Sequence, residues 1–183
     1  YRNVLRVLKD LVSRQDAAFL KNYQGYKYVA GDARSKSLDL YNCRIGGNVD
    51  LNHGFTGIGQ VSLNSATVDA ALHCDGSLFF QEHGVALSLD GLKLRSSMFF
   101  RSDSEGRICL FHSTATMRGA KVGHRLVCDA VTFHKPLPSW DNLHKGDPMR
   151  RREGYAFFAK NVEIGSDVAF NMSEEMHGDV TTE

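Results

Sequence analysis

Histidine and cysteine are the residues of this sequence that could hold a transition metal, eight and four in number. Local zinc sites use closely spaced pairs such as CxxC or HxxxH, and neither pattern occurs. The cysteines stand far apart, at Cys43, Cys74, Cys109 and Cys128, without a dense disulfide framework. We therefore expect no metal site, and four reduced thiols that are mostly small core residues.

Carboxylates could act as the acid and base of a glycosidase if the fold gathers them on one outer face. Asp39 and Asp50 stand in the middle of short alternating apolar segments. The equivalent positions of the later repeats, described below, hold Ser88, Phe99, Phe158 and Ala169. No ladder of acids forms, so we expect no catalytic residue there. A site assembled from loop residues such as Asp69, Asp75 and Asp129 stays open.

Glycine pairs could cradle a phosphate group, but their context here is wrong for it. The segments "IGGN" (45–48) and "GIGQVS" (57–62) do not continue as GxGxxG into a helix, and no GxxxxGK[ST] occurs. We expect no nucleotide and no other cofactor. The glycines are instead assigned to bends with positive φ.

Charge and composition exclude several classes of partner. Lys and Arg number 22 against 21 Asp and Glu, and this net charge of +1 gives no broad field for nucleic acid or for anionic lipid. No apolar run reaches the roughly 20 residues that span a bilayer, and no signal-peptide pattern opens the chain. The sequence predicts a soluble cytoplasmic protein, or an effector exported without a signal peptide if the chain is a fragment.

A repeated pattern indicates which elements position these residues. The segment "LDLYNCRIGGNVDL" (38–51) aligns without gaps to "LSLDGLKLRSSMFF" (87–100) and "FFAKNVEIGSDVAF" (157–170), with six apolar positions matched. We call these six positions the frame. A second block aligns "ATVDAALHCDGSLF" (66–79) with "AKVGHRLVCDAVTF" (120–133), and the strand signals "VSL" (61–63) and "ICL" (108–110) precede its two copies.

Short alternating triplets separated by Gly, Asn, Asp and Ser are stable only when stacked on neighbouring copies. The predicted fold is all-β, a right-handed parallel β-helix (β-solenoid) of about five coils. Within each triplet the flanking residues point inward and the middle one points outward, so Asp39, Asp50 and His73 are expected on the surface. Cys74 and Cys128 share a position two coils apart, roughly 10 Å, which is too far for a disulfide.

The ends and one insertion depart from the repeat. Residues 1–36 are predicted to form an N-terminal cap with an amphipathic α-helix at 4–20, or a linker helix to an upstream domain. Residues 37–171 form the β-helix, and 172–183 a polar tail. A loop at 135–154 holds Trp140, Arg150, Arg151 and Arg152, residue types that favour a partner-binding site. Alternatively, the Trp packs on the solenoid and the Arg residues are solvated.

The phrases "GGNVDLNHGFTGIGQVSLNSATVDAALHCDGSLFFQEHGVALSLDGLKLRSSMFF" and "AKVGHRLVCDA" resemble a bacterial repeat family often labelled membrane-associated oxidoreductase or hypothetical protein. The likeness covers residues 38–133 and 155–171, and the family looks distantly similar to pentapeptide-repeat solenoids. It implies a β-helix, while no cofactor motif supports the oxidoreductase label. The chain departs from the family's I-G-G phrase at 68–70 and 95–97.

The regular core and the absence of a convergent catalytic set in the sequence predict a non-catalytic protein-interaction or scaffold domain, of bacterial origin. An unidentified protein is the expected partner. A carbohydrate-binding or polysaccharide-acting β-helix is the alternative, indicated by outward aromatic residues such as Phe99 and Phe158. A third reading is the recognition domain of a larger secreted effector.

Overall fold

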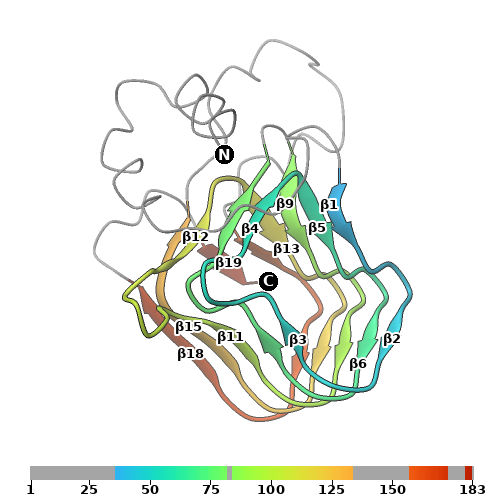
Figure 1. Ribbon diagram of the computed structural model, residues 1–183. Coiled ribbons are helices and arrows are strands. Elements are labelled where there is room, and N and C mark those ends of the chain that lie inside the picture. The colour runs from blue at the N-terminus through green and yellow to red at the C-terminus, as the bar shows by residue number, and fades with distance from the viewer. Residues whose placement is uncertain (1–35, 82–83, 134–156, 173–179, 183) are drawn as a thin grey trace, which may run out of the picture.

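The chain folds as a four-sided parallel β-solenoid, and Figure 1 shows its coils stacked one behind another. This computed structural model describes residues 36–81, 84–133, 157–172 and 180–182. Every strand pair within these residues is parallel, as the stacking of successive coils requires. The all-β parallel solenoid predicted from the sequence is confirmed.

The first two faces of the solenoid are separate sheets. The first face holds β1 (Lys36–Asp39), β5 (Gln60–Ser62), β9 (Val85–Ser88), β13 (Thr114–Thr116), β16 (Phe157–Ala159) and β19 (Val180–Thr182). The second face holds β2 (Arg44–Ile45), β6 (Thr67–Val68), β10 (Lys93–Leu94), β14 (Lys121–Val122) and β17 (Glu163–Ile164). Strands of two residues suffice because the interior ones are paired on both sides.

The third and fourth faces share one sheet, because the long strand β15 (Leu126–Phe133) crosses from one to the other. The third face holds β3 (Val49–Asp50), β7 (Leu72–His73), β11 (Met98–Phe100), the first half of β15 and β18 (Val168–Met172). The fourth face holds β4 (Thr56–Ile58), β8 (Leu78–Phe80), β12 (Cys109–Phe111) and the second half of β15.

The register shows that the two sequence blocks are one frame. Parallel pairing places Leu38, Val61, Leu87, Ala115 and Phe157 in a single row, which is the first frame position. The second block therefore corresponds to the later positions of the same frame. The segment "VSL" (61–63) supplies the first positions of the frame in that coil. The segment "ICL" has a different role, because β13 takes the place of "VSL" in that coil and β12 lies on the fourth face.

The number of turns and the ends differ slightly from the expectation. Five copies of the frame stack, but only about four turns separate the first copy from the fifth. No helix occurs among the described residues, and the predicted helix at 4–20 lies outside them. The strand β19 lies in the segment predicted as a polar tail and pairs with β16. The handedness of the coil stays a prediction.

The frame residues fill the interior as the alternation predicts. Val61, Leu63 and Leu87 have no exposed surface, while Asp39 and Asp50 are exposed. The first face departs from the pattern, because its outward Ser88 and Thr116 are buried. They lie within a polar row in which the Ser88 hydroxyl is 2.7 Å from Asn64 Oδ1 and 3.4 Å from Thr116 Oγ1.

Positive φ recurs at one corner of every coil, between the first and second faces. This row holds Asn42, Ser65, Gly91, Gly119 and Asn161, with φ between 54° and 67°. Asn and Gly tolerate this left-handed conformation best, which explains the residue types. The prediction of positive φ for the glycines is wrong at Gly46 and Gly47, which turn the next corner without it.

The fourth face contributes an aromatic stack that runs through three coils. The rings of Phe79, Phe111 and Phe133 lie 4.9 Å apart in succession, with interplanar angles of 11° and 12°. All three side chains are buried and belong to the core. Such a stack stabilises the pairing of coils beyond the area that it buries.

All four cysteines are free thiols, as predicted, and Cys43 alone is exposed. Burial raises the pKa of the Cys74 and Cys109 thiols well above the ordinary value, and that of Cys128 to about 12. The buried thiols are therefore protonated at neutral pH and act as core residues. Within the part of the chain that the structure describes, no helix has the length and apolarity to cross a bilayer.

Candidate functional site: an axial groove on the second face

The residues that the sequence singled out do not converge. Trp140 and the arginines at 150–152 lie outside the described residues, so their partner-binding role stays a prediction. Asp69 lies beside the second face, Asp75 follows β7 of the third face, and Asp129 lies in β15. Among the described residues, no group of three or more His, Cys, Asp or Glu side chains could hold a metal ion.

Asp75 is neutralised by an arginine of the next coil. Arg101 donates to both of its carboxylate oxygens, at 3.0 and 2.8 Å. This hydrogen bonding raises the pKa of Arg101, and the charges of Asp75 and Asp129 act in the same direction. Asp75 therefore pairs with a guanidinium group rather than with a second carboxylate, which differs from the paired acids of a glycosidase.

The outward ring of Phe99 is enclosed rather than presented. His73 of the preceding coil stacks on it at 5.0 Å between centroids and 12° between planes. The Arg101 guanidinium lies 4.4 Å from the centroid of the same ring. With the ring enclosed by these two groups, the described residues of this face offer no open aromatic platform that would favour a sugar. Phe158 is also partly buried.

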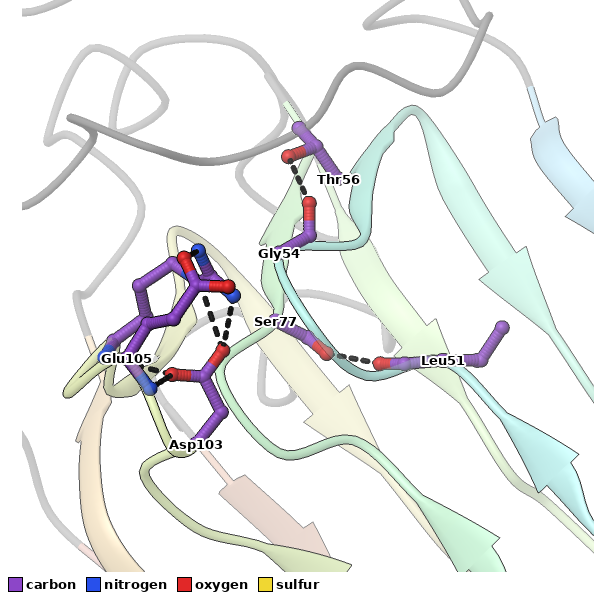
Figure 2. Close-up of polar contacts among 7 residues, drawn as sticks. Leu51, Gly54, Thr56, Ser77, Asp103 and Glu105 are labelled. Carbon is purple, nitrogen blue, oxygen red and sulfur yellow. Dashed lines mark hydrogen bonds and ion pairs between the residues drawn. The ribbon is translucent and has the colours of Figure 1, made fainter.

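A loop inserted in the third coil connects β11 of the third face to β12 of the fourth, and Figure 2 shows its polar contacts. Asp103 accepts hydrogen bonds from the backbone N–H groups of Glu105 and Arg107 at 2.9 and 3.0 Å, and from Arg107 Nε at 2.8 Å. The Ser77 hydroxyl donates to the Leu51 carbonyl beside it. Gly76 has φ of 63° and leaves room for Asp103, whose Oδ2 would lie 2.3 Å from an added Cβ. These contacts have a structural role.

The second face carries an open groove of about 550 Å³ that runs across four coils. Its rims are the outward residues of β6, β10, β14 and β17 and the residues that follow these strands. They are Thr67, Lys93, Lys121 and Glu163 on one rim, and Asp69, Arg95, Gly123 and Gly165 on the other.

Two glycines make part of this groove bare backbone. An added Cβ at Gly123 would lie 2.0 Å from the Arg95 carbonyl oxygen, and one at Gly165 would lie 2.0 Å from that of Gly123. Any side chain there would push two coils apart. The same row holds Gly46, where nothing lies within 4 Å of an added Cβ. The glycine requirement therefore comes from close coil contact and applies to the fourth and fifth coils, because the second and third coils hold Asp69 and Arg95 in this row.

Charges along the groove are mostly paired. Asp69 lies between Arg44 and Arg95, with N···O distances of 3.4 and 3.3 Å. The Lys121 ammonium donates to both Glu163 oxygens at 2.8 Å. Lys93 stands between these two groups and has no ion-pair partner among the described residues. Among the residues that the structure describes, the groove thus offers one cation without an ion-pair partner, Lys93, beside exposed backbone.

Comparison with family models, with curated proteins and with solved structures finds no match for this chain. The groove itself was missed by the sequence analysis. Its signal was present, because polar or charged residues precede the fourth frame position in every coil, at Arg44, Thr67, Lys93, Lys121 and Glu163.

Proposed function

We propose that this chain is a non-catalytic protein-interaction domain whose second-face groove binds an extended, acidic segment of a partner protein. The observation that carries the proposal is the groove itself, with Lys93 uncommitted between two ion-paired groups. A carboxylate of the partner would pair with Lys93, and the backbone along Gly123 and Gly165 would lie close to the bound chain.

The dimensions of the groove suit a short linear segment. Four coils spaced about 4.8 Å apart span roughly 14 Å, which an extended peptide covers with about four or five residues at about 3.3 Å each. Such a segment would run across the strands, along the axis of the solenoid. Repeat proteins use this kind of elongated surface to bind other macromolecules.

The residues that line the groove favour a protein over a carbohydrate as the binding partner. None of the described residues along the groove carries an aromatic ring, and the outward Phe99 is enclosed by His73 and Arg101. Sugar-binding grooves present flat aromatic surfaces, so the carbohydrate alternative loses its main support. The groove has no feature that separates a free-standing scaffold from the recognition domain of a larger effector.

The test is a fluorescence-polarisation screen of labelled peptides with five-residue acidic, basic or neutral centres between Gly-Ser flanks. We expect selective binding of acidic peptides that weakens with salt. Lys93→Glu should weaken binding about tenfold, because it replaces an attraction by a repulsion in a partly exposed site. Lys36→Glu makes the same charge change on the first face and should have no effect.

The proposal fails if basic peptides bind as well as acidic ones, or if the two lysine variants behave alike. It also fails if no peptide binds and a glycan array gives binding that Lys93→Glu abolishes.

A further inference from the structure

The second face carries more positive charge than its own acids neutralise. In its outward rows, the first three coils hold one carboxylate, Asp69, and three cations, which are Arg44, Lys93 and Arg95. The fourth and fifth coils add one ammonium and one carboxylate, which pair with each other. Three cations against one carboxylate leave two positive charges without an acid among the described residues of this face.

Asp69 is held by two guanidinium groups where one is enough to balance its charge. Arg44 Nε and Nη2 both donate to its Oδ2 at 3.4 Å. Arg95 approaches the other oxygen at 3.3 Å as an ion pair, and its guanidinium donates no hydrogen bond to the described residues. The Arg95 side chain is 71% exposed, and the Asp69 side chain is 18% exposed. Arg95 is therefore able to turn to a ligand while Arg44 still compensates the half-buried carboxylate.

Lys93 and Arg95 lie on the same side of one extended segment. Lys93 is in β10, Arg95 follows it after the inward Leu94, and both side chains are exposed. Alternate residues of an extended chain lie about 6.6 Å apart, at about 3.3 Å per residue. In the next coil the neighbour of Arg95 is Gly123, so no side chain fills the space on that side. Both cations can therefore reach one anion that lies over the groove.

We infer, on the basis of the proposed function, that the acidic residue of the partner segment is a phosphorylated serine or threonine held by Lys93 and Arg95. A phosphate monoester carries about −1.5 to −2 charges at pH 7, which matches the two charges in excess, whereas a carboxylate carries only one. The planar Arg95 guanidinium donates two parallel N–H bonds to two phosphate oxygens, and the Lys93 ammonium pairs with the third. A phosphate therefore engages both cations, and a glutamate engages one.

One phosphate on a peptide fits the groove better than a nucleic-acid backbone. The excess charge is confined to the first three coils, and beyond them Glu163 stands on the rim and repels a further phosphate. The rest of the groove is bare backbone at Gly123 and Gly165, which suits the main chain of neighbouring peptide residues. The groove is therefore expected to recognise a single phosphorylated residue within an extended segment.

Fluorescence polarisation with three labelled peptides that differ only in a central phosphoserine, glutamate or serine tests this inference. We expect the phosphoserine peptide to bind about tenfold more tightly than the glutamate peptide. Arg95→Gln should weaken binding of the phosphoserine peptide about tenfold and of the glutamate peptide at most about twofold, with unchanged circular dichroism. Arg125→Gln makes the same charge change in an exposed ion pair outside the groove and should alter neither affinity.

Equal affinity for the phosphoserine and glutamate peptides overturns this inference and leaves the proposed function standing, whereas absence of binding by every acidic peptide overturns both. An equal effect of Arg95→Gln and Arg125→Gln would indicate nonspecific charge attraction and overturn the inference. Displacement of the phosphoserine peptide by an equal concentration of inorganic phosphate would overturn it as well, because the peptide would then contribute nothing to binding.

Discussion

Gly123→Ala should destabilise the solenoid strongly, and Gly46→Ala should not, although the two residues occupy the same row. The added Cβ at position 123 would lie 2.0 Å from the Arg95 carbonyl oxygen, and real Cβ atoms essentially never approach within 3.0 Å. The neighbouring backbones must therefore separate by about 1 Å. That movement lengthens the hydrogen bond from Gly123 N to Leu94 O, now 2.8 Å. Overpacking against backbone costs about 3 kcal/mol.

At Gly46 nothing lies within 4 Å of the added Cβ, and φ is not positive. Alanine there should stabilise the chain by about 0.5 kcal/mol, because it restricts the unfolded state. Gly165→Ala meets the same 2.0 Å contact but lies in the last coil, which can move, so about half the cost of Gly123→Ala is expected. Urea unfolding followed by circular dichroism measures all three. Equal stability of Gly123→Ala and Gly46→Ala, within 0.5 kcal/mol, would refute the close-contact argument.

Two further predictions concern the core. Phe111→Ala removes the middle ring of the fourth-face stack and should lower the unfolding free energy by about 4 kcal/mol. Phe99→Ala, on the outer surface, should lower it by less than half as much. Equal losses of unfolding free energy in urea would contradict this prediction. Burial raises the pKa of Cys128 from 9.0 to about 12, so the unfolded chain loses this proton first as the pH rises. The stability from Cys128 is complete below about pH 9 and falls between about pH 9 and 12, by up to about 1.4 kcal/mol per pH unit. Cys128→Ala should show a smaller fall in urea unfolding at pH 8 to 10.5, and an unchanged slope would contradict it.

The sequence predicted the solenoid because its signal is local and repeated. Frame residues such as Leu87 and Leu89 alternate over three positions, and stacking is the only way that such short strands become stable. The fourth face carries a weaker signal. The gapless match of 66–79 with 120–133 aligns Phe79 with Phe133, but the longer connection before β12 moves Phe111 out of this alignment. The continuous stack of Phe79, Phe111 and Phe133 was missed for this reason.

The site was less predictable than the fold. The groove depends on the distance between coils at Gly123 and Gly165, which is a property of the stacked backbone rather than of the residues in one segment. Similarly, the outward position of Phe99 was predictable, but its enclosure by His73 and Arg101 comes from two different coils. Contacts between coils join residues about 25 positions apart, and a pattern within one coil does not contain them.

The loop that holds Asp103 shows how this architecture tolerates changes in length. Four residues, 74–77, connect β7 to β8 in the second coil, and eight residues, 101–108, connect β11 to β12 in the next. The rows on both sides stay in register, with Phe100 beside Cys128 and Leu110 beside Leu78. Insertions at this corner are therefore accommodated outside the stack. A lineage of such proteins can diversify its corners by gain and loss of residues while the number and order of its coils stay constant.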